Sequence, residues 1–179
     1  MNTLAMGRMT GVAIGVLVGL VIALVLIKFW NKDGKAKTEY DEMQERERGK
    51  AYKWAFWAVV AYECVMAVLA TGDVKLPLDG FGIHMLAILL GVGVQAGYCI
   101  WHDAYIGINT NMGRFFAICV VITLVNLAVA GMGIAHGEML KDGVFQLPFV
   151  NLVCALLFGI MGVELGIKLA LSKQEKEEE

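Results

Sequence analysis

The chain has 179 residues, of which 58% are hydrophobic and 18% charged, and its formal net charge is −2. A soluble domain carries roughly a quarter charged residues and needs polar helix faces, so this composition excludes an ordinary soluble domain. Its charges are segregated between long apolar runs, as is typical of membrane proteins. A slightly negative chain also gives no indication of a nucleic-acid partner, and we expect none.

Five apolar runs are each long enough to cross a bilayer as a helix. About 20 residues suffice, because a helix rises ~1.5 Å per residue through ~30 Å of hydrocarbon. The runs are continuous rather than alternating, which favours helices over a β-barrel. The sequence therefore predicts an all-α, polytopic membrane bundle of five transmembrane helices. The predicted spans are about 9–30, 54–71, 82–101, 115–136 and 148–171.

Residues 1–30 form the first predicted segment, and two interpretations of it are open. Arg8 before an apolar core also occurs in signal peptides. The core is too long for one, however, and Lys28, Phe29 and Trp30 after it are typical of a stop-transfer flank with an interfacial anchor. We therefore expect a retained transmembrane helix.

Glycines recur every fourth residue in this first span, at Gly7, Gly11, Gly15 and Gly19. This spacing places them along one helix face, where the missing side chains let another helix approach closely. The pattern, a glycine zipper, predicts close helix packing. It leaves open whether the partner helix lies in the same chain or in a second subunit.

Residues 31–53 are predicted to form a cytoplasmic linker and a charged juxtamembrane helix. Thr38 followed by Asp41 resembles a helix N-cap with an acid at N3. Acidic residues come first and basic residues last, which suits the helix dipole. We expect this helix to feed into the second span, with Gly49 as a bend. The alternative is a solvated charge run without fixed structure.

Within that helix, the stretch from Asp41-Glu42-Met43-Gln44 to Arg48-Gly49-Lys50 forms a motif. It resembles the juxtamembrane Asp-Glu-x-Gln-(x)3-Arg-Gly-Lys segment of small, uncharacterised multi-pass membrane proteins of Gram-positive bacteria. The resemblance covers about a dozen residues and the general hydropathy profile. It implies a bacterial plasma membrane and transfers no catalytic residue.

The four later spans, within residues 54–171, are divided into two hairpins that resemble each other weakly. A shift of 63 residues places Glu63 on Asn126 and the Asp-Gly pair at 79–80 on the pair at 142–143. A duplication of 53–103 as 114–170, related by an axis along the membrane normal, is one interpretation of this resemblance. Chance similarity between apolar helices is the alternative. Residues 172–179 are predicted to be a charged cytoplasmic tail.

Three polar side chains fall inside predicted spans: Glu63, Gln95 and Asn126. A charge at the centre of a span costs at least ~2.5–3.5 kcal/mol on insertion scales, so such residues are often functional. Glu63 is interpreted either as a proton- or cation-linked site or as a neutral hydrogen-bonded contact. Asn126 is interpreted first as an interhelical hydrogen-bonding residue. Gln95 is a candidate partner of Glu63.

Other chemistry-bearing residues give weaker patterns. His84, His136 and Asp79 are placed at one end of the bundle, but their spacing does not specify a metal geometry. We expect neither a metal site nor a cofactor. Glu164 and Lys168 are expected to form an i,i+4 contact. The four cysteines fall in apolar runs without a CxxC pair, and packing roles are expected for them.

The distribution of basic residues predicts the orientation. The positive-inside rule assigns the more basic loops to the cytoplasm. This assignment puts the N-terminus outside and the C-terminus in the cytoplasm of a multi-pass protein of the cell membrane. The three outer basic residues are Arg8, Lys75 and Lys141. The twelve cytoplasmic ones are Lys28, Lys32, Lys35, Lys37, Arg46, Arg48, Lys50, Lys53, Arg114, Lys168, Lys173 and Lys176.

No catalytic or phosphate-binding motif is found in the sequence. We therefore expect a non-enzymatic integral membrane protein that acts by helix–helix or protein–protein interaction, as an accessory protein or complex subunit. Its expected partners are the lipid bilayer and a further copy or another membrane protein. The alternative is a small transporter or channel with Glu63 as a mid-membrane carboxylate.

Overall fold

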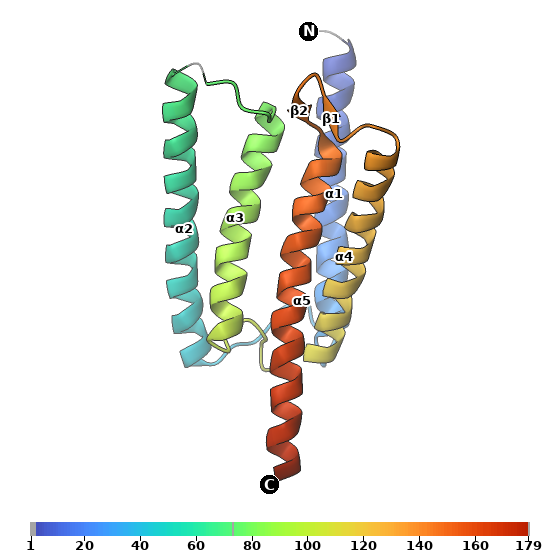
Figure 1. The fold of residues 1–179 in the computed structure, drawn as a ribbon. Helices are drawn as coiled ribbons and strands as arrows, with labels where there is room; N and C mark the ends of the chain where they lie inside the picture. The colour runs from blue at the N-terminus through green and yellow to red at the C-terminus, as the bar shows by residue number, and fades with distance from the viewer. Residues whose placement is uncertain (1–2, 73, 179) are drawn as a thin grey trace.

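The computed structural model describes residues 3–72 and 74–178, with side chains for residues 6–7, 10–72 and 74–171. It is a bundle of long helices (Figure 1). All five helices are long and apolar enough to cross a membrane, so this prediction is confirmed and indicates a multi-pass membrane protein. They are α1 (Thr3–Trp30), α2 (Glu42–Thr71), α3 (Gly80–Trp101), α4 (Met112–Ala135) and α5 (Leu147–Glu178). The strands β1 (Leu140–Lys141) and β2 (Val144–Phe145) pair between α4 and α5.

The start of α2 differs from the prediction. Asp41, not Thr38, is the N-cap, and its carboxylate accepts a 2.7 Å hydrogen bond from the backbone N–H of Gln44. The Gln44 side chain accepts from the Asp41 N–H in return, which completes a capping box. The predicted Thr38 cap is therefore wrong. Beyond the cap, α2 continues through Gly49 to Thr71, so the juxtamembrane helix and the second span are one element.

Side-chain caps also start the next two helices. Asp79 accepts a 2.7 Å hydrogen bond from the N–H of Gly82 at the start of α3. Asn111 accepts a 3.0 Å bond from the N–H of Arg114 at the start of α4. Such caps satisfy helix donors that have no partner within the helix, and each stabilises by about 1 kcal/mol. Asp79, weakly considered as a metal ligand, thus has a structural role.

The helices pack in the spatial order α2, α3, α5, α4, and α1 has its main contact with α4 (Figure 1). This order is compatible with a two-fold duplication of 53–103 and 114–170, in which α3 and α5 meet at the axis. The outer connections differ, since the β-hairpin lies in the second one. The duplication stays a prediction.

Close packing is concentrated where glycines face a neighbouring helix. A Cβ added to Gly133 of α4 would lie 2.5 Å from the Cβ of Pro148 in α5. Gly162 and Gly166 of α5 face Cys119 and Phe116 of α4 at ordinary contact distance. Small residues at such positions let helices approach in lipid, where no hydrophobic effect draws helices together. The α4–α5 pair is accordingly tightly packed.

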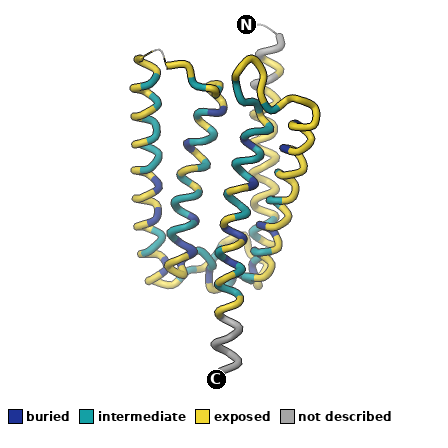
Figure 2. The backbone as a smooth tube through the Cα atoms, in the orientation of Figure 1, coloured by how far each residue is buried: buried dark blue, intermediate teal, exposed yellow. Residues whose placement is uncertain are grey.

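The main core lies near the end of the bundle where residues 31–41 and 102–111 connect the helices; we call this the linker end. Its buried side chains come from α3, α4 and α5, whereas α1 is exposed or half-buried from residue 10 onward (Figure 2). All four cysteines are free thiols, and two of them, Cys99 and Cys119, are buried. The core cluster is Ala96, Ile100, Phe115, Cys119, Met161 and Leu165.

Candidate functional site

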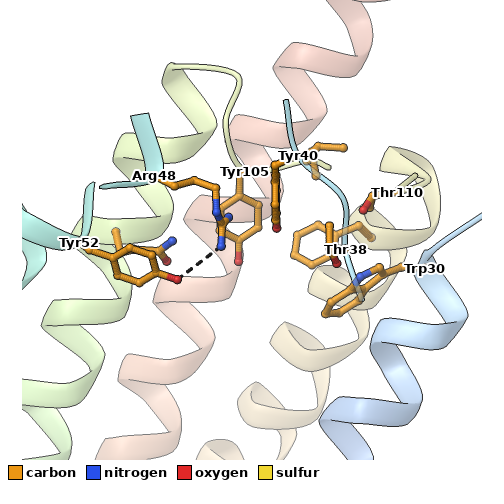
Figure 3. A pocket seen from close by; sticks show the side chains of 10 residues that line it. Trp30, Thr38, Tyr40, Arg48, Tyr52, Tyr105 and Thr110 are labelled. Carbon is orange, nitrogen blue, oxygen red and sulfur yellow. Dashed lines mark hydrogen bonds between the residues drawn. The ribbon is translucent and has the colours of Figure 1, made fainter. Parts of the chain in front are cut away.

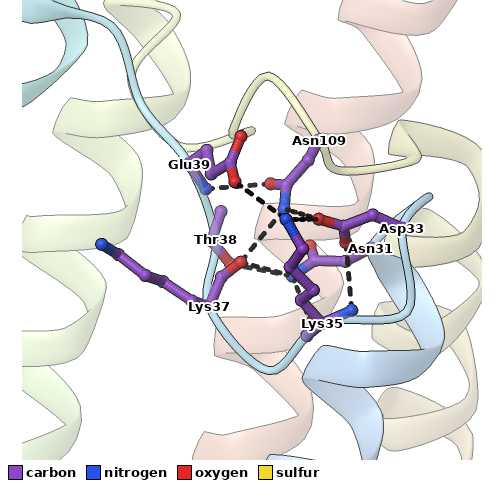
Figure 4. Close-up of polar contacts among 7 residues, drawn as sticks. All are labelled: Asn31, Asp33, Lys35, Lys37, Thr38, Glu39 and Asn109. Atoms are coloured by element: carbon purple, nitrogen blue, oxygen red, sulfur yellow. Dashed lines mark hydrogen bonds and ion pairs between the residues drawn. The ribbon is translucent and has the colours of Figure 1, made fainter.

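Two asparagines fasten the linker 31–41 onto the loop 102–111 (Figure 4). Asn31, only 1% exposed, donates to the carbonyl oxygens of Lys35 and Lys37 at 3.0 and 3.3 Å. Its Oδ1 accepts a 3.0 Å bond from the hydroxyl of Thr110. These partners satisfy a buried amide that would otherwise be costly, so the linker has a defined path.

Asn109 makes the complementary set of bonds from the loop. Its Oδ1 accepts from the N–H of Glu39 at 2.9 Å, and its Nδ2 donates to the Lys37 carbonyl at 3.0 Å. Nδ2 also lies 3.2 Å from a carboxylate oxygen of Asp33. Hydrogen bonds from Lys35 and Asn109 lower the pKa of that carboxyl. The alternative of a solvated charge run without fixed structure does not hold here, because the linker is hydrogen-bonded to a distant loop.

Gln44 ties the start of α2 to the same loop. Its Nε2 donates to the carbonyl oxygens of Asp103 and Ile106 at 2.8 and 3.0 Å. The same side chain closes the capping box with Asp41. One glutamine of the juxtamembrane motif therefore sets both where α2 begins and how the loop lies against it.

Beside these contacts lies a partly open pocket of about 180 Å³ between the linker, the loop and α1 to α4 (Figure 3). Trp30 and Phe115 provide apolar walls, and their rings contact edge to face with centroids 4.8 Å apart. The remaining lining is rich in hydroxyl and amide groups. The polar residues that line this Arg48 pocket are Thr38, Tyr40, Arg48, Tyr52, Gln95, Tyr105 and Thr110.

Arg48 is the cation of this pocket. Its guanidinium carbon lies 3.9 Å from the ring centroid of Tyr40, a cation–π contact. Its two hydrogen bonds, to the Ala104 carbonyl and the Tyr52 hydroxyl, are both long at 3.4 Å. Among the described residues, no carboxylate forms an ion pair with it. The pocket therefore holds an uncompensated positive charge.

Two tyrosines at this site are held neutral. Burial is the main cause that raises the pKa of Tyr105 far above its ordinary value, and burial also raises the pKa of Tyr40. Both hydroxyls keep their protons at neutral pH and can donate a hydrogen bond to a ligand. Within the described part of the chain, the Tyr105 hydroxyl has no hydrogen-bond partner.

The raised pKa values predict a late phase in a titration of tyrosine absorbance. Phenolate formation should extend beyond the ordinary pKa of about 10, and Tyr105→Phe should remove the latest component. Because the pKa of these tyrosines is higher in the folded state, ionisation above pH ~10 favours the unfolded state. The free energy of unfolding should therefore be unaffected by these groups below pH ~10 and should fall as the pH rises further. Tyr52→Phe, at a more exposed tyrosine, is the control. A late phase unchanged in Tyr105→Phe would contradict the assignment.

The polar residues predicted inside the spans do not meet in one cavity. Glu63 faces His84, with its Oε1 3.5 Å from His84 Nδ1, and both side chains are more than 40% exposed. Asn126 donates to the Ile122 carbonyl in its own helix rather than across to another helix. Gln95 donates to the sulfur of Cys99 and is the only one of the three that lines the Arg48 pocket.

The weaker predicted contacts are also rearranged. Glu164 does not pair with Lys168: its Oε1 accepts from the Trp101 indole at 2.9 Å, and Lys168 pairs with Asp103 instead. Trp101 and Asp103, at and just after the end of α3, bind Glu164 and Lys168 instead, which i,i+4 spacing alone does not reveal. His84 faces Glu63, while His136 caps α4. Within the described residues, no three His, Cys, Asp or Glu side chains are grouped for a metal ion.

The Arg48 pocket was not predicted from the sequence. A signal was present, because Tyr40 and Tyr52 flank Arg48 in a segment otherwise rich in charge. The loop 102–111 also combines Tyr105 with two asparagines and a threonine. Nothing in either segment indicates that the two are neighbours in space.

No family model, curated protein or solved structure matches this chain. The resemblance of the segment around Arg48 to Gram-positive membrane proteins stays a prediction. Arguments about function therefore depend on the geometry of the molecule.

Proposed function

We propose that the chain is a non-enzymatic protein of the cell membrane that acts by self-association through α1, as an accessory protein or complex subunit. The observation that carries this proposal is the isolation of α1. No residue described from position 10 to 30 is buried, although the other four helices pack against one another. A helix that contributes so little to its own bundle is available to another.

The glycine zipper is the face of α1 that favours a second copy as the partner. A Cβ added at Gly7, Gly11, Gly15 or Gly19 would meet no atom within 4 Å. Within the described part of the chain this face therefore has no packing partner, unlike the glycines between α4 and α5. Four small residues at four-residue spacing form a self-complementary surface, because the same groove is offered by both copies of a two-fold dimer.

We propose an orientation with the N-terminus outside and the C-terminus in the cytoplasm. The start of α1 lies at the end of the bundle that carries residues 74–79 and 136–146, and the linker end lies opposite (Figure 1). Arg8, Lys75 and Lys141 belong to the first end, and the other basic residues of the 15 belong to the linker end. Epitope tags on intact cells test this: an accessible C-terminal tag would reverse the proposal.

Self-association is tested by single-molecule photobleaching of the full chain in liposomes. We expect dimers for the wild type. Gly15→Leu should weaken dimerisation about tenfold or more, since losing ~1.4 kcal/mol of close contact already suffices. Ala13→Leu, which adds bulk on another face of α1, is the matched control and should dimerise like the wild type. A monomeric wild type, or equal dimerisation of Gly15→Leu, would contradict the proposal.

The transport alternative lacks support, because Glu63, Gln95 and Asn126 line no common cavity in the described part of the chain. Glu63 lies in a partly exposed contact with His84, and Asn126 bonds within α4. Mid-membrane polar groups that form a path need a common water-accessible space. The non-enzymatic, interaction-based proposal is therefore the better supported of the two.

A further inference from the structure

We propose that the Arg48 pocket binds a phosphate group, either of a lipid headgroup or of a small soluble compound. This site is separate from the α1 surface, and the proposal does not depend on self-association. It is argued from the charge of the pocket, its hydrogen-bond donors, its volume and its position at the linker end.

The first argument is the uncompensated charge. Arg48 is half-buried, and among the described residues it engages the ring faces of Tyr40 and Tyr52 and two acceptors at 3.4 Å. The neighbouring acid, Glu47, cannot neutralise it. One oxygen of Glu47 accepts from Lys50 at 2.6 Å, and the other accepts from the Tyr98 hydroxyl at 2.9 Å. A guanidinium has five donor N–H groups in a fork that matches an oxyanion, so donors of Arg48 remain for a ligand.

The second argument is the chemistry of the lining. Among the described residues, no acidic residue lines the pocket, whereas two threonines and three tyrosines do. The hydroxyl of Tyr105 has no partner among the described residues. Neutral hydroxyls beside a cation complement an anion, and the aromatic walls lower the local dielectric, which strengthens hydrogen bonds to charge.

The third argument is the volume of the pocket and its position at the end of the helices. The volume of about 180 Å³ is several times the ~30 Å³ that one water molecule occupies in the liquid. A tetrahedral oxyanion with a few waters fits this space. The pocket lies where α1 ends at Trp30 and where α2 passes Tyr52 into its apolar part. Lipid phosphates are found at this depth, and basic and aromatic side chains are enriched there.

The experiment measures thermal stability of the full chain in an uncharged detergent. One arm titrates sodium phosphate against sodium chloride at equal ionic strength. The other titrates dioctanoyl phosphatidic acid against dioctanoylglycerol, which differs by the phosphate alone. We expect stabilisation by phosphatidic acid and none by dioctanoylglycerol. A response to both phosphate probes assigns the site to the phosphate group itself, and a response to phosphatidic acid alone assigns it to a lipid headgroup.

The variants separate a specific site from diffuse electrostatics. Arg48→Gln should weaken apparent phosphate affinity about tenfold or more, because a charge-assisted hydrogen bond is lost. Arg46→Gln removes the same charge from the exposed face two residues away and should leave the affinity unchanged. Tyr105→Phe deletes one hydroxyl and should weaken binding severalfold, even if Arg48→Gln does not fold.

Three results would overturn the proposal. The first is no response of the wild type to either phosphate probe. The second is an equal loss in Arg46→Gln and Arg48→Gln, which would mean general attraction to a basic surface. The third is a response of Tyr105→Phe identical to that of the wild type, which would place the anion outside the pocket.

Discussion

Gly133→Val should be among the most destabilising single substitutions in this chain. A Cβ at position 133 would lie 2.5 Å from the Cβ of Pro148, in the contact between α4 and α5. The proline ring is rigid and sits near the start of α5, so neither side can yield without moving a helix. Overpacking of this kind costs about 1–3 kcal/mol or more. At about 3 kcal/mol, Tm falls by roughly 6–12 °C for a chain of this size.

The matched control for this prediction is Gly131→Val in the same helix. A Cβ at Gly131 meets nothing within 4 Å, while the cost in helix propensity is similar for both substitutions. Thermal unfolding in detergent compares the two variants with the wild type. Equal Tm values for the two variants would show that the approach of α4 to Pro148 does not determine stability.

Asn31→Leu should release the linker 31–41 from the loop 102–111. Leucine is close in volume but leaves the Thr110 hydroxyl and the Lys35 carbonyl without this partner, while the Lys37 carbonyl keeps only its bond from Asn109. An unsatisfied buried group costs about 1–3 kcal/mol. Of these bonds only the one from Thr110 is fully buried, so we expect a loss of about 1–3 kcal/mol confined to this end. Trypsin should then cleave the linker at its lysines much faster than in the wild type.

Asn126→Leu is the control for that substitution. Asn126 bonds only to the Ile122 carbonyl of its own helix, and that carbonyl is already an acceptor in the helix ladder. We expect its trypsin sensitivity and Tm to match the wild type. Slow cleavage of Asn31→Leu, at the wild-type rate, would contradict the view that Asn31 holds the linker. Asn31→Leu should also weaken phosphate binding in the Arg48 pocket, since Thr38 and Thr110, which contact Asn31, line that pocket.

The number, length and type of the helices follow from the sequence because each depends on local properties. Apolar runs of about 20 residues have few alternatives to a spanning helix, since backbone groups in lipid must bond within the segment. All five predicted spans correspond to helices of suitable length. The cap of α2 was misplaced by three residues, because Thr38 and Asp41 both fit an N-cap pattern and only Gln44 decides between them.

The tertiary structure decided which polar residues meet. Asn31 and Asn109 are 78 positions apart in the chain, and nothing local indicates that both fasten the same linker. Glu164 and Lys168 have ideal spacing for each other, yet the end of α3 supplies better partners. Likewise, the four glycines of α1 have the same four-residue spacing as Gly162 and Gly166 of α5, which contact α4. Only the arrangement of the bundle shows that the α1 glycines have no such contact.

The sequence by itself determined that this is a helical membrane protein with five membrane-length helices, because hydropathy and helix length act within each segment. Only the tertiary structure decided that α1 stands apart with its glycines unpartnered, and that Arg48 lies among hydroxyls without an acid. These features depend on contacts between segments distant in the chain, for which a single sequence carries no local signal. The two proposed interaction surfaces, one on α1 and one at the linker end, arise from those contacts.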